Sequence, residues 1–250
     1  MDLKIPNETG FLSTVVELSK TKSNKLAILC PGYLDSKEYY HLKSMSTELT
    51  SNGYTCVRFD PTGTWDSTGS INDYTMTRYL KDVASIVEYM KRKAKVSNLL
   101  VAGHSRGGQA ALLYAARNQV NTVIAAMPSG GPLTSQDVHN YTVWEETRKQ
   151  ISYRNIPESR KQRKFVVPFN YLQDIYKYDM ITEVARITAR VVFIAGELDD
   201  VCPPKSVESL FNMTLGPKSF SILKGIGHSY RNSIAETTIV NAAIMSALNF

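Results

Sequence analysis

The chain has 250 residues, of which 43% are hydrophobic and 21% charged, and a formal net charge of +6. This composition excludes a disordered or fibrous chain, and the length suffices for one large α/β domain or two small ones with a substantial core. Lys and Arg cluster in local runs such as residues 91–93 and 160–164, without the interleaved aromatic residues of a nucleic-acid site. We therefore expect solvated helix faces and no nucleic-acid partner.

The N-terminal segment and the cysteines indicate a compartment. The segment lacks the basic stretch, apolar core and small-residue cleavage site of a signal peptide, and no stretch reaches the ~20 apolar residues of a membrane span. Cys30, Cys56 and Cys202 cannot all pair and lack the spacing of a zinc site. The sequence therefore predicts a cytoplasmic protein with reduced thiols and no membrane span.

Short apolar runs alternate with longer amphipathic segments along most of the chain. This alternation is typical of a largely parallel sheet flanked by helices, so we predict the α/β class and one domain over residues 1–250. The expected sheet has about seven strands. The predicted strands are residues 15–18, 26–29, 54–59, 99–102, 123–126, 191–195 and 220–223, and the predicted helices are residues 39–51, 74–92, 107–118, 205–213 and 231–248.

Residues 130–186 interrupt this alternation. They are longer than a usual crossover between strands, and the stretch 164–171 has no obvious place in the central sheet. We predict an inserted cap over the sheet. Its basic run, residues 160–164, gives the hypothesis that the cap favours acidic substrates.

The motif Gly103-His104-Ser105-Arg106-Gly107 lies between a predicted strand and a predicted helix. A G-x-S-x-G turn in this context exposes a serine nucleophile at the carboxyl edge of the sheet, and the glycines avoid collisions with the neighbouring strand and helix. The alternatives are a close-packed glycine-rich loop and a phosphate-binding turn, but the Lys-Ser or Lys-Thr ending of a P-loop is absent. We predict that Ser105 is the nucleophile.

A serine nucleophile needs a base, and the sequence offers His41, His104, His139 and His228. Only His228 follows a predicted strand on a glycine-rich loop, and it comes after both the nucleophile and the candidate acids in the chain. That is the order nucleophile, acid, histidine. His104 should point away from the serine. We predict that His228 is the base.

Three carboxylates compete for the acid that orients the histidine. Asp199 lies three residues beyond Gly196, at a turn after a strand, and is preferred over Asp200 and Glu197. Asp200 is instead expected to cap the helix that starts near Pro203.

Two backbone N–H groups are the candidate donors of an oxyanion hole. One is the amide of Arg106, directly after the nucleophile. The other is the amide of Tyr33, in a Pro-Gly loop after an early strand. Without the serine motif, this loop would be interpreted only as a turn.

Together these segments resemble the α/β-hydrolase superfamily from about residue 25 to residue 249. Within it, residues 165–171, 174 and 178–179 resemble the cap of bacterial cinnamoyl and feruloyl esterases and related serine aminopeptidase-like hydrolases. The usual His-Gly of the oxyanion loop is Pro31-Gly32 here. The other matching segments are the loop Asp60-Pro61-Thr62-Gly63, the acid loop Gly196-Glu197-Leu198-Asp199 and the histidine loop Gly225-Ile226-Gly227-His228.

The resemblance implies a serine carboxylesterase that cleaves small or aryl esters through an acyl-enzyme, without cofactor or metal. A serine peptidase or a thioesterase with the same triad is an alternative, because the acyl chemistry is shared. A non-catalytic ligand-binding protein on a hydrolase scaffold is a third reading, which the presence of all three triad residues disfavours. The expected partner is a small-molecule ester, and a homodimer stays open.

Overall fold

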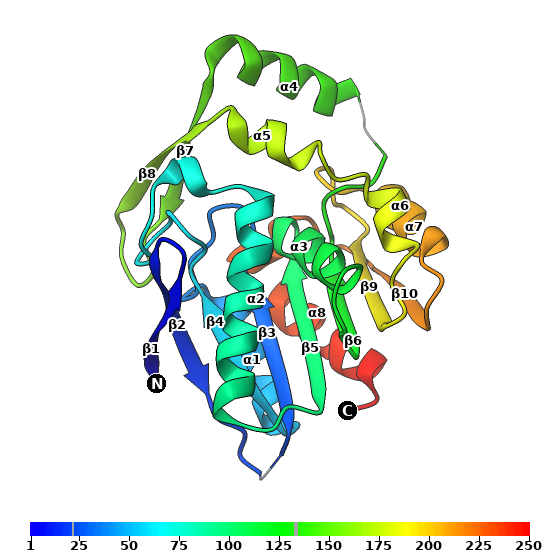
Figure 1. Ribbon diagram of the computed structural model, residues 1–250. Coiled ribbons are helices and arrows are strands. Elements are labelled where there is room, and N and C mark those ends of the chain that lie inside the picture. The colour runs from blue at the N-terminus through cyan, green and yellow to red at the C-terminus, as the bar shows by residue number, and fades with distance from the viewer. Residues whose placement is uncertain (22, 133–134) are drawn as a thin grey trace.

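The computed structural model describes residues 1–21, 23–132 and 135–250 (Figure 1). Its main sheet has the strand order β1-β2-β4-β3-β5-β6-β9-β10. The pairs β1–β2 and β2–β4 are antiparallel, and the other pairs of this sheet are parallel. The strands are β1 Asp2–Asn7, β2 Gly10–Glu17, β3 Lys25–Cys30, β4 Tyr54–Phe59, β5 Asn98–His104, β6 Thr122–Ala126, β9 Arg190–Gly196 and β10 Lys218–Leu223.

Helices cover both faces of this sheet (Figure 1). Side chains of the central strands alternate between two apolar clusters, as the period of two in a strand requires. In β3, Leu26 and Ile28 join one cluster, whereas Ala27 and Leu29 join the other. The first cluster packs under α2 Met76–Lys93, α3 Arg106–Ala115 and α7 Pro204–Met213, and the second packs under α1 Tyr40–Ser51 and α8 Ile234–Leu248.

The predicted α/β class and mostly parallel sheet are confirmed, and in the described residues the main sheet has eight strands, one more than expected. The additional strand is β1, a polar edge strand in which only Ile5 is buried. The predicted helices lie at α1, α2, α3, α7 and α8, with ends that shift by a few residues. The largest shifts, of three residues each, are at the end of α3 and at the start of α8, which is preceded by the short 3-10 helix η2 Tyr230–Asn232. In the part of the chain that is described, no helix is long and apolar enough to cross a membrane.

Between β6 and β9 the chain inserts further elements, most of which form the cap at the top of Figure 1, whereas the last of them, a short helix, packs beside α7. The segment 164–171 lies outside the central sheet, as expected, in a separate two-stranded hairpin and the helix that follows it. Aromatic contacts attach the cap to the core, such as Phe165 on Trp65 and Tyr171 stacked on Tyr74. The cap elements are α4 Ser135–Thr147, β7 Lys149–Asn155, β8 Gln162–Pro168 and α5 Asn170–Ile175, and the helix beside α7 is α6 Met180–Val184. The short 3-10 helix η1 Ile71–Asp73 lies near β8.

Candidate active site

Ser105 occupies a sharp turn between β5 and α3. Its backbone has φ 54° and ψ −120°, a conformation that side chains rarely adopt. A Cβ on Gly103 would lie 2.2 Å from the carbonyl carbon of Gly107, and a Cβ on Gly107 would lie 2.0 Å from the carbonyl oxygen of Cys30. Both positions therefore require glycine, for the steric reason inferred from the sequence.

Ser105, His228 and Asp199 form a continuous hydrogen-bonded set. Ser105 Oγ lies 2.9 Å from His228 Nε2, and His228 Nδ1 lies 2.8 Å from Asp199 Oδ2. The other carboxylate oxygen of Asp199 accepts the backbone N–H groups of Val201 at 2.9 Å and Cys202 at 2.7 Å. These two bonds fix the carboxylate in an orientation that presents Oδ2 to the imidazole.

The loops that carry the acid and the histidine are joined by hydrogen bonds at the ends of two neighbouring parallel strands. The N–H of Glu197 donates to the carbonyl of Leu223, and the N–H of Leu198 donates to that of Ile226, each at 2.9 Å. The Glu197 carboxylate accepts the N–H of Gly225 at 2.9 Å. Because β9 and β10 end at the same sheet edge, this pairing brings together two side chains far apart in sequence.

The rival acids have other environments. Asp200 is exposed. The carboxylate of Glu197 accepts the backbone N–H of Gly225 in the histidine loop and does not contact the imidazole through a hydrogen bond in the described structure. The prediction that Asp200 caps the following helix is wrong. Helix α7 has Pro203 as its N-cap and no side-chain cap bond, because Pro204 at the first helical position supplies the preset φ that starts a helix without one.

The two candidate oxyanion donors lie in the expected places. Arg106 is the first residue of α3, and Tyr33 follows β3 in the loop beside the serine turn. Neither backbone N–H donates to another atom of residues 1–21, 23–132 and 135–250. Both amides therefore stay candidate donors to a substrate oxygen. The Arg106 guanidinium is buried and lies 4.4 Å from the centroid of the Tyr171 ring in the cap.

Three buried aromatic side chains brace the loop that contains Tyr33. The hydroxyl of Tyr79 donates to the carbonyl of Pro31, and the N–H of Leu34 donates to the hydroxyl of Tyr74, both at 2.9 Å. The indole N–H of Trp65 donates to the Leu34 carbonyl at 3.0 Å. Sequence reasoning missed these contacts, because tertiary bonds from aromatic side chains to a distant backbone leave no local pattern.

A second serine, Ser129, lies beside the nucleophile and was also missed. Its Oγ is 3.4 Å from Ser105 Oγ and 3.7 Å from the thiol of Cys202, and its N–H donates to the Ser105 carbonyl at 3.1 Å. Burial raises the pKa of the Cys202 thiol to about 12, so the thiol stays protonated and can donate to the hydroxyl. The position of Ser129, just beyond the carboxyl end of β6, was the available signal.

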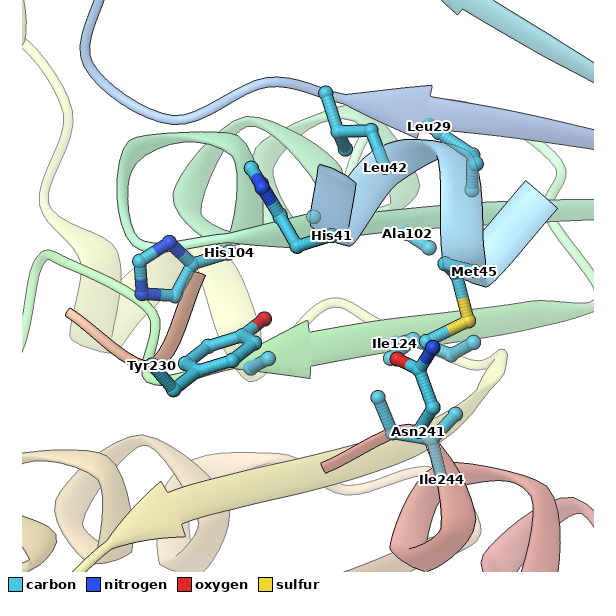
Figure 2. A pocket seen from close by; sticks show the side chains of 12 residues that line it. Leu29, His41, Leu42, Met45, Ala102, His104, Ile124, Tyr230, Asn241 and Ile244 are labelled. Carbon is cyan, nitrogen blue, oxygen red and sulfur yellow. The ribbon is translucent and has the colours of Figure 1, made fainter. Parts of the chain in front are cut away.

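The remaining described histidines do not join the triad. His41 and His104 line a small cavity of about 20 Å³ with Tyr230 (Figure 2). The ring of His104 is 4.7 Å from that of His228, but it makes no hydrogen bond to the serine in the described structure. Burial lowers the pKa of His41 to about 3 and lowers that of His104 well below its usual value, so both rings are neutral.

Asp35, His41 and His104 are the one group of potential metal ligands in the described part of the chain, with ligand atoms within 4.8 Å of one another. The guanidinium of Arg231 already donates to the Asp35 carboxylate at 2.5 Å. Because a divalent cation would be placed beside this fixed positive charge, the three side chains fit a buried polar cluster better than a metal centre.

The strand order and the position of the serine turn define the class. A mostly parallel sheet with the serine after β5, the acid after β9 and the histidine after β10 is the architecture of an α/β hydrolase. The chain belongs to the alpha/beta hydrolase fold family, whose profile matches residues 26–155.

Relatives of known identity agree with this membership. The palmitoyl-protein thioesterase ABHD10, mitochondrial, of Mus musculus is 23% identical over 180 residues, which are 70% of this chain and 59% of the relative. Est1E of Butyrivibrio proteoclasticus with bound ferulic acid aligns with a TM-score of 0.78 at 21% identity, over 98% of this chain and 97% of that one. DcsB in complex with its substrate analogue aligns with a TM-score of 0.82 at 17% identity, over 98% of this chain and 97% of that chain. The structural likeness establishes the fold.

Proposed function

We propose that the protein is a serine carboxylesterase that hydrolyses small or aryl carboxylic esters through an acyl-enzyme. The observation that carries this proposal is the hydrogen-bonded set Ser105–His228–Asp199, with distances of 2.9 Å and 2.8 Å. Ser105 and His228 are both partly exposed, so a substrate carbonyl has access to the nucleophile.

In the first half-reaction, His228 Nε2 takes the proton of Ser105 as Oγ attacks the ester carbonyl carbon. Asp199 holds the imidazole with Nδ1–H toward its carboxylate and stabilises the imidazolium that forms. The Tyr33 and Arg106 amides donate to the oxygen of the tetrahedral intermediate. The intermediate collapses when His228 passes its proton to the leaving alcohol, which leaves an acyl group on Ser105.

In the second half-reaction, water replaces the alcohol. His228 takes a proton from the water as its oxygen attacks the acyl carbon, and the same two amides hold the new oxyanion. The proton then returns to Ser105 Oγ as the carboxylic acid departs. No step requires a group other than these side chains, the two amides and water.

A thioesterase is the second candidate, because the curated relative is named as a palmitoyl-protein thioesterase. The chain spans 59% of the length of that relative, and the identity is 23%. Thioester and oxygen-ester cleavage use the same acyl-enzyme, so the triad supports both.

We also propose one hydrolase domain over residues 1–250, with a cap insertion at about residues 130–186. Three free, buried cysteines support a reducing compartment such as the cytoplasm. The mouse relative is named as mitochondrial, so fractionation of cells that express the full chain is the appropriate test of location.

Hydrolysis of 4-nitrophenyl acetate, butyrate and octanoate, methyl ferulate and a palmitoyl thioester tests the proposal. Each is compared between the wild type and Ser105→Ala. We expect turnover of at least one oxygen ester that the variant abolishes. Turnover of the thioester alone would favour the second candidate, and no turnover by folded wild type would contradict both.

A further inference from the structure

A polar cleft of about 400 Å³ lies between the cap hairpin β7–β8 and the core. The hairpin contributes Arg154, the start of α1 contributes Tyr39 and Tyr40, and η2 contributes Arg231. The cleft lies beside the proposed oxyanion loop, because Arg154, which lines it, donates a hydrogen bond to the carbonyl of Tyr33.

Arg154 connects this cleft to the oxyanion loop. Its Nε donates to the carbonyl of Tyr33 at 3.2 Å, and its guanidinium carbon lies 5.2 Å from the centroid of the Tyr33 ring. Its Nη1 donates to the carbonyl of Tyr153 at 3.0 Å, whereas Nη2 has no hydrogen-bond partner among the described residues. The described chain also offers Arg154 no carboxylate within 4.0 Å.

The other charges at the cleft are already paired. The carboxylate of Asp35 accepts from Arg231, and that of Glu158 accepts from Lys43 at 3.0 Å. Arg154 therefore has no direct carboxylate partner among the described residues, and Asp35, the buried carboxyl that its charge influences, already pairs with Arg231. Its cross-strand partner in the hairpin is Arg163, a second cation. Like charges directly opposite one another destabilise a strand pair, so the hairpin retains an electrostatic cost that a bound anion would relieve.

We infer that this cleft binds a carboxylate or phosphate group on the leaving-group side of the substrate, with Arg154 as the specificity-determining residue. The leaving oxygen must face His228 to receive its proton, and Arg231, in η2 three residues after His228, lines the cleft. A guanidinium with a free N–H edge forms strong, directional hydrogen bonds to such anions. The inference rests on the proposed esterase function.

It also relocates the acidic-substrate hypothesis, which the sequence attached to the basic run 160–164. Those side chains are exposed, and none of residues 160, 161, 163 and 164 lines the cleft. Lys164 lies on the hairpin face opposite to that of Arg154 and, unlike its cross-strand partner Tyr153, does not line the cleft. It is therefore a matched control for removal of a positive charge.

The test compares 4-nitrophenyl butyrate with 3-carboxy-4-nitrophenyl butyrate, whose leaving groups differ by one carboxylate. For each ester, kcat/KM is divided by the rate constant of hydroxide-catalysed hydrolysis, which removes the difference in intrinsic reactivity. We expect wild type and Lys164→Gln to prefer the carboxylated ester about tenfold, and Arg154→Gln to lose this preference. The preference should fall as ionic strength rises.

Equal normalised rates for the two esters in wild type would overturn the inference. An equal fall in kcat/KM for both esters in Arg154→Gln would also overturn the inference, because Arg154 would then only support the Tyr33 carbonyl. These outcomes are distinct from failure of the esterase proposal, in which wild type hydrolyses neither ester faster than Ser105→Ala.

Discussion

Gly103 and Gly107 approach each other so closely across the serine turn that a Cβ on Gly103 would lie 2.2 Å from the Gly107 carbonyl carbon. Strand β5 and helix α3 can approach this closely only because both residues are glycine and carry no Cβ. The approach holds the residue between them, Ser105, at φ 54° and above the sheet edge. The position of the nucleophile is thus a consequence of backbone packing, and substitutions test it.

Gly107→Ala should destabilise the fold by about 3 kcal/mol or more, since its Cβ would meet the backbone oxygen of Cys30 at 2.0 Å. Gly225→Ala is the control. Its φ is 72°, but no atom lies within 4 Å of its Cβ, so only the left-handed backbone is strained, at about 1–2 kcal/mol. Urea unfolding measures the free energy of unfolding of both variants. Equal losses of stability in the two variants would refute the close-packed turn.

Asp199→Asn should lower kcat by about 10³- to 10⁴-fold with little change in KM, because an amide in place of Oδ2 no longer accepts the Nδ1 proton of His228. Asp200→Asn removes the neighbouring charge from an exposed side chain and should leave kcat within about twofold. Ester kinetics on both variants assign the acid, and a greater loss in Asp200→Asn would reverse the assignment.

Acid should destabilise the protein through His41. Burial lowers its folded pKa to about 3 from 6.5, so between these values the unfolded chain binds more protons. The contribution of neutral His41 to the free energy of unfolding is complete above pH 6.5 and is lost progressively as the pH falls below 6.5. At pH 5 the loss from this residue is about 2 kcal/mol. His104, whose pKa burial also lowers, acts in the same direction.

The measurement is the free energy of unfolding of wild type and His41→Phe at pH 7.5 and pH 5. The variant should lose about 2 kcal/mol less between the two pH values than wild type loses. Asp35 Oδ2 lies 3.9 Å from His41 Nε2 and burial raises the pKa of this carboxyl, but Asp35 is present in both proteins. An unchanged pH dependence in the variant would show that His41 is not buried neutral.

The cysteines should be unreactive in the native protein. All three are buried, and burial raises the pKa of Cys56 to about 11 and that of Cys202 to about 12, so thiolates are scarce at pH 8. Titration with an aromatic disulfide reagent should label none of them before denaturation and all three after it. Fast native labelling of one thiol would contradict its burial.

The strands and the order of the candidate triad could be predicted because their signals are local. Buried parallel strands have continuous apolar runs, and a serine turn of this kind has its own glycine pattern. The sequence favours Asp199 over Asp200 because a turn at Gly196 presents the residue three positions further on. In the structure the buried Asp199 carboxylate lies 2.8 Å from the imidazole of His228.

Other parts depend on contacts that the sequence does not encode locally. Strand β1 was missed because its polar residues pair only along a sheet edge. The hairpin β7–β8 was recognised only as lying outside the sheet, since the side chains that attach it, such as Phe165 and Arg154, contact residues about 100 positions or more away. Ser129 has no motif of its own, and only the folding of β6 beside β5 brings it to Ser105.

The most direct test of the account is the reaction of the native protein with a fluorophosphonate, followed by peptide mapping with mass spectrometry. The account predicts one phosphonyl adduct on Ser105, strongly slowed in His228→Ala because no base then takes the serine proton. A native wild-type protein that forms no adduct, or forms it on Ser129, would contradict the assignment of Ser105 as the nucleophile.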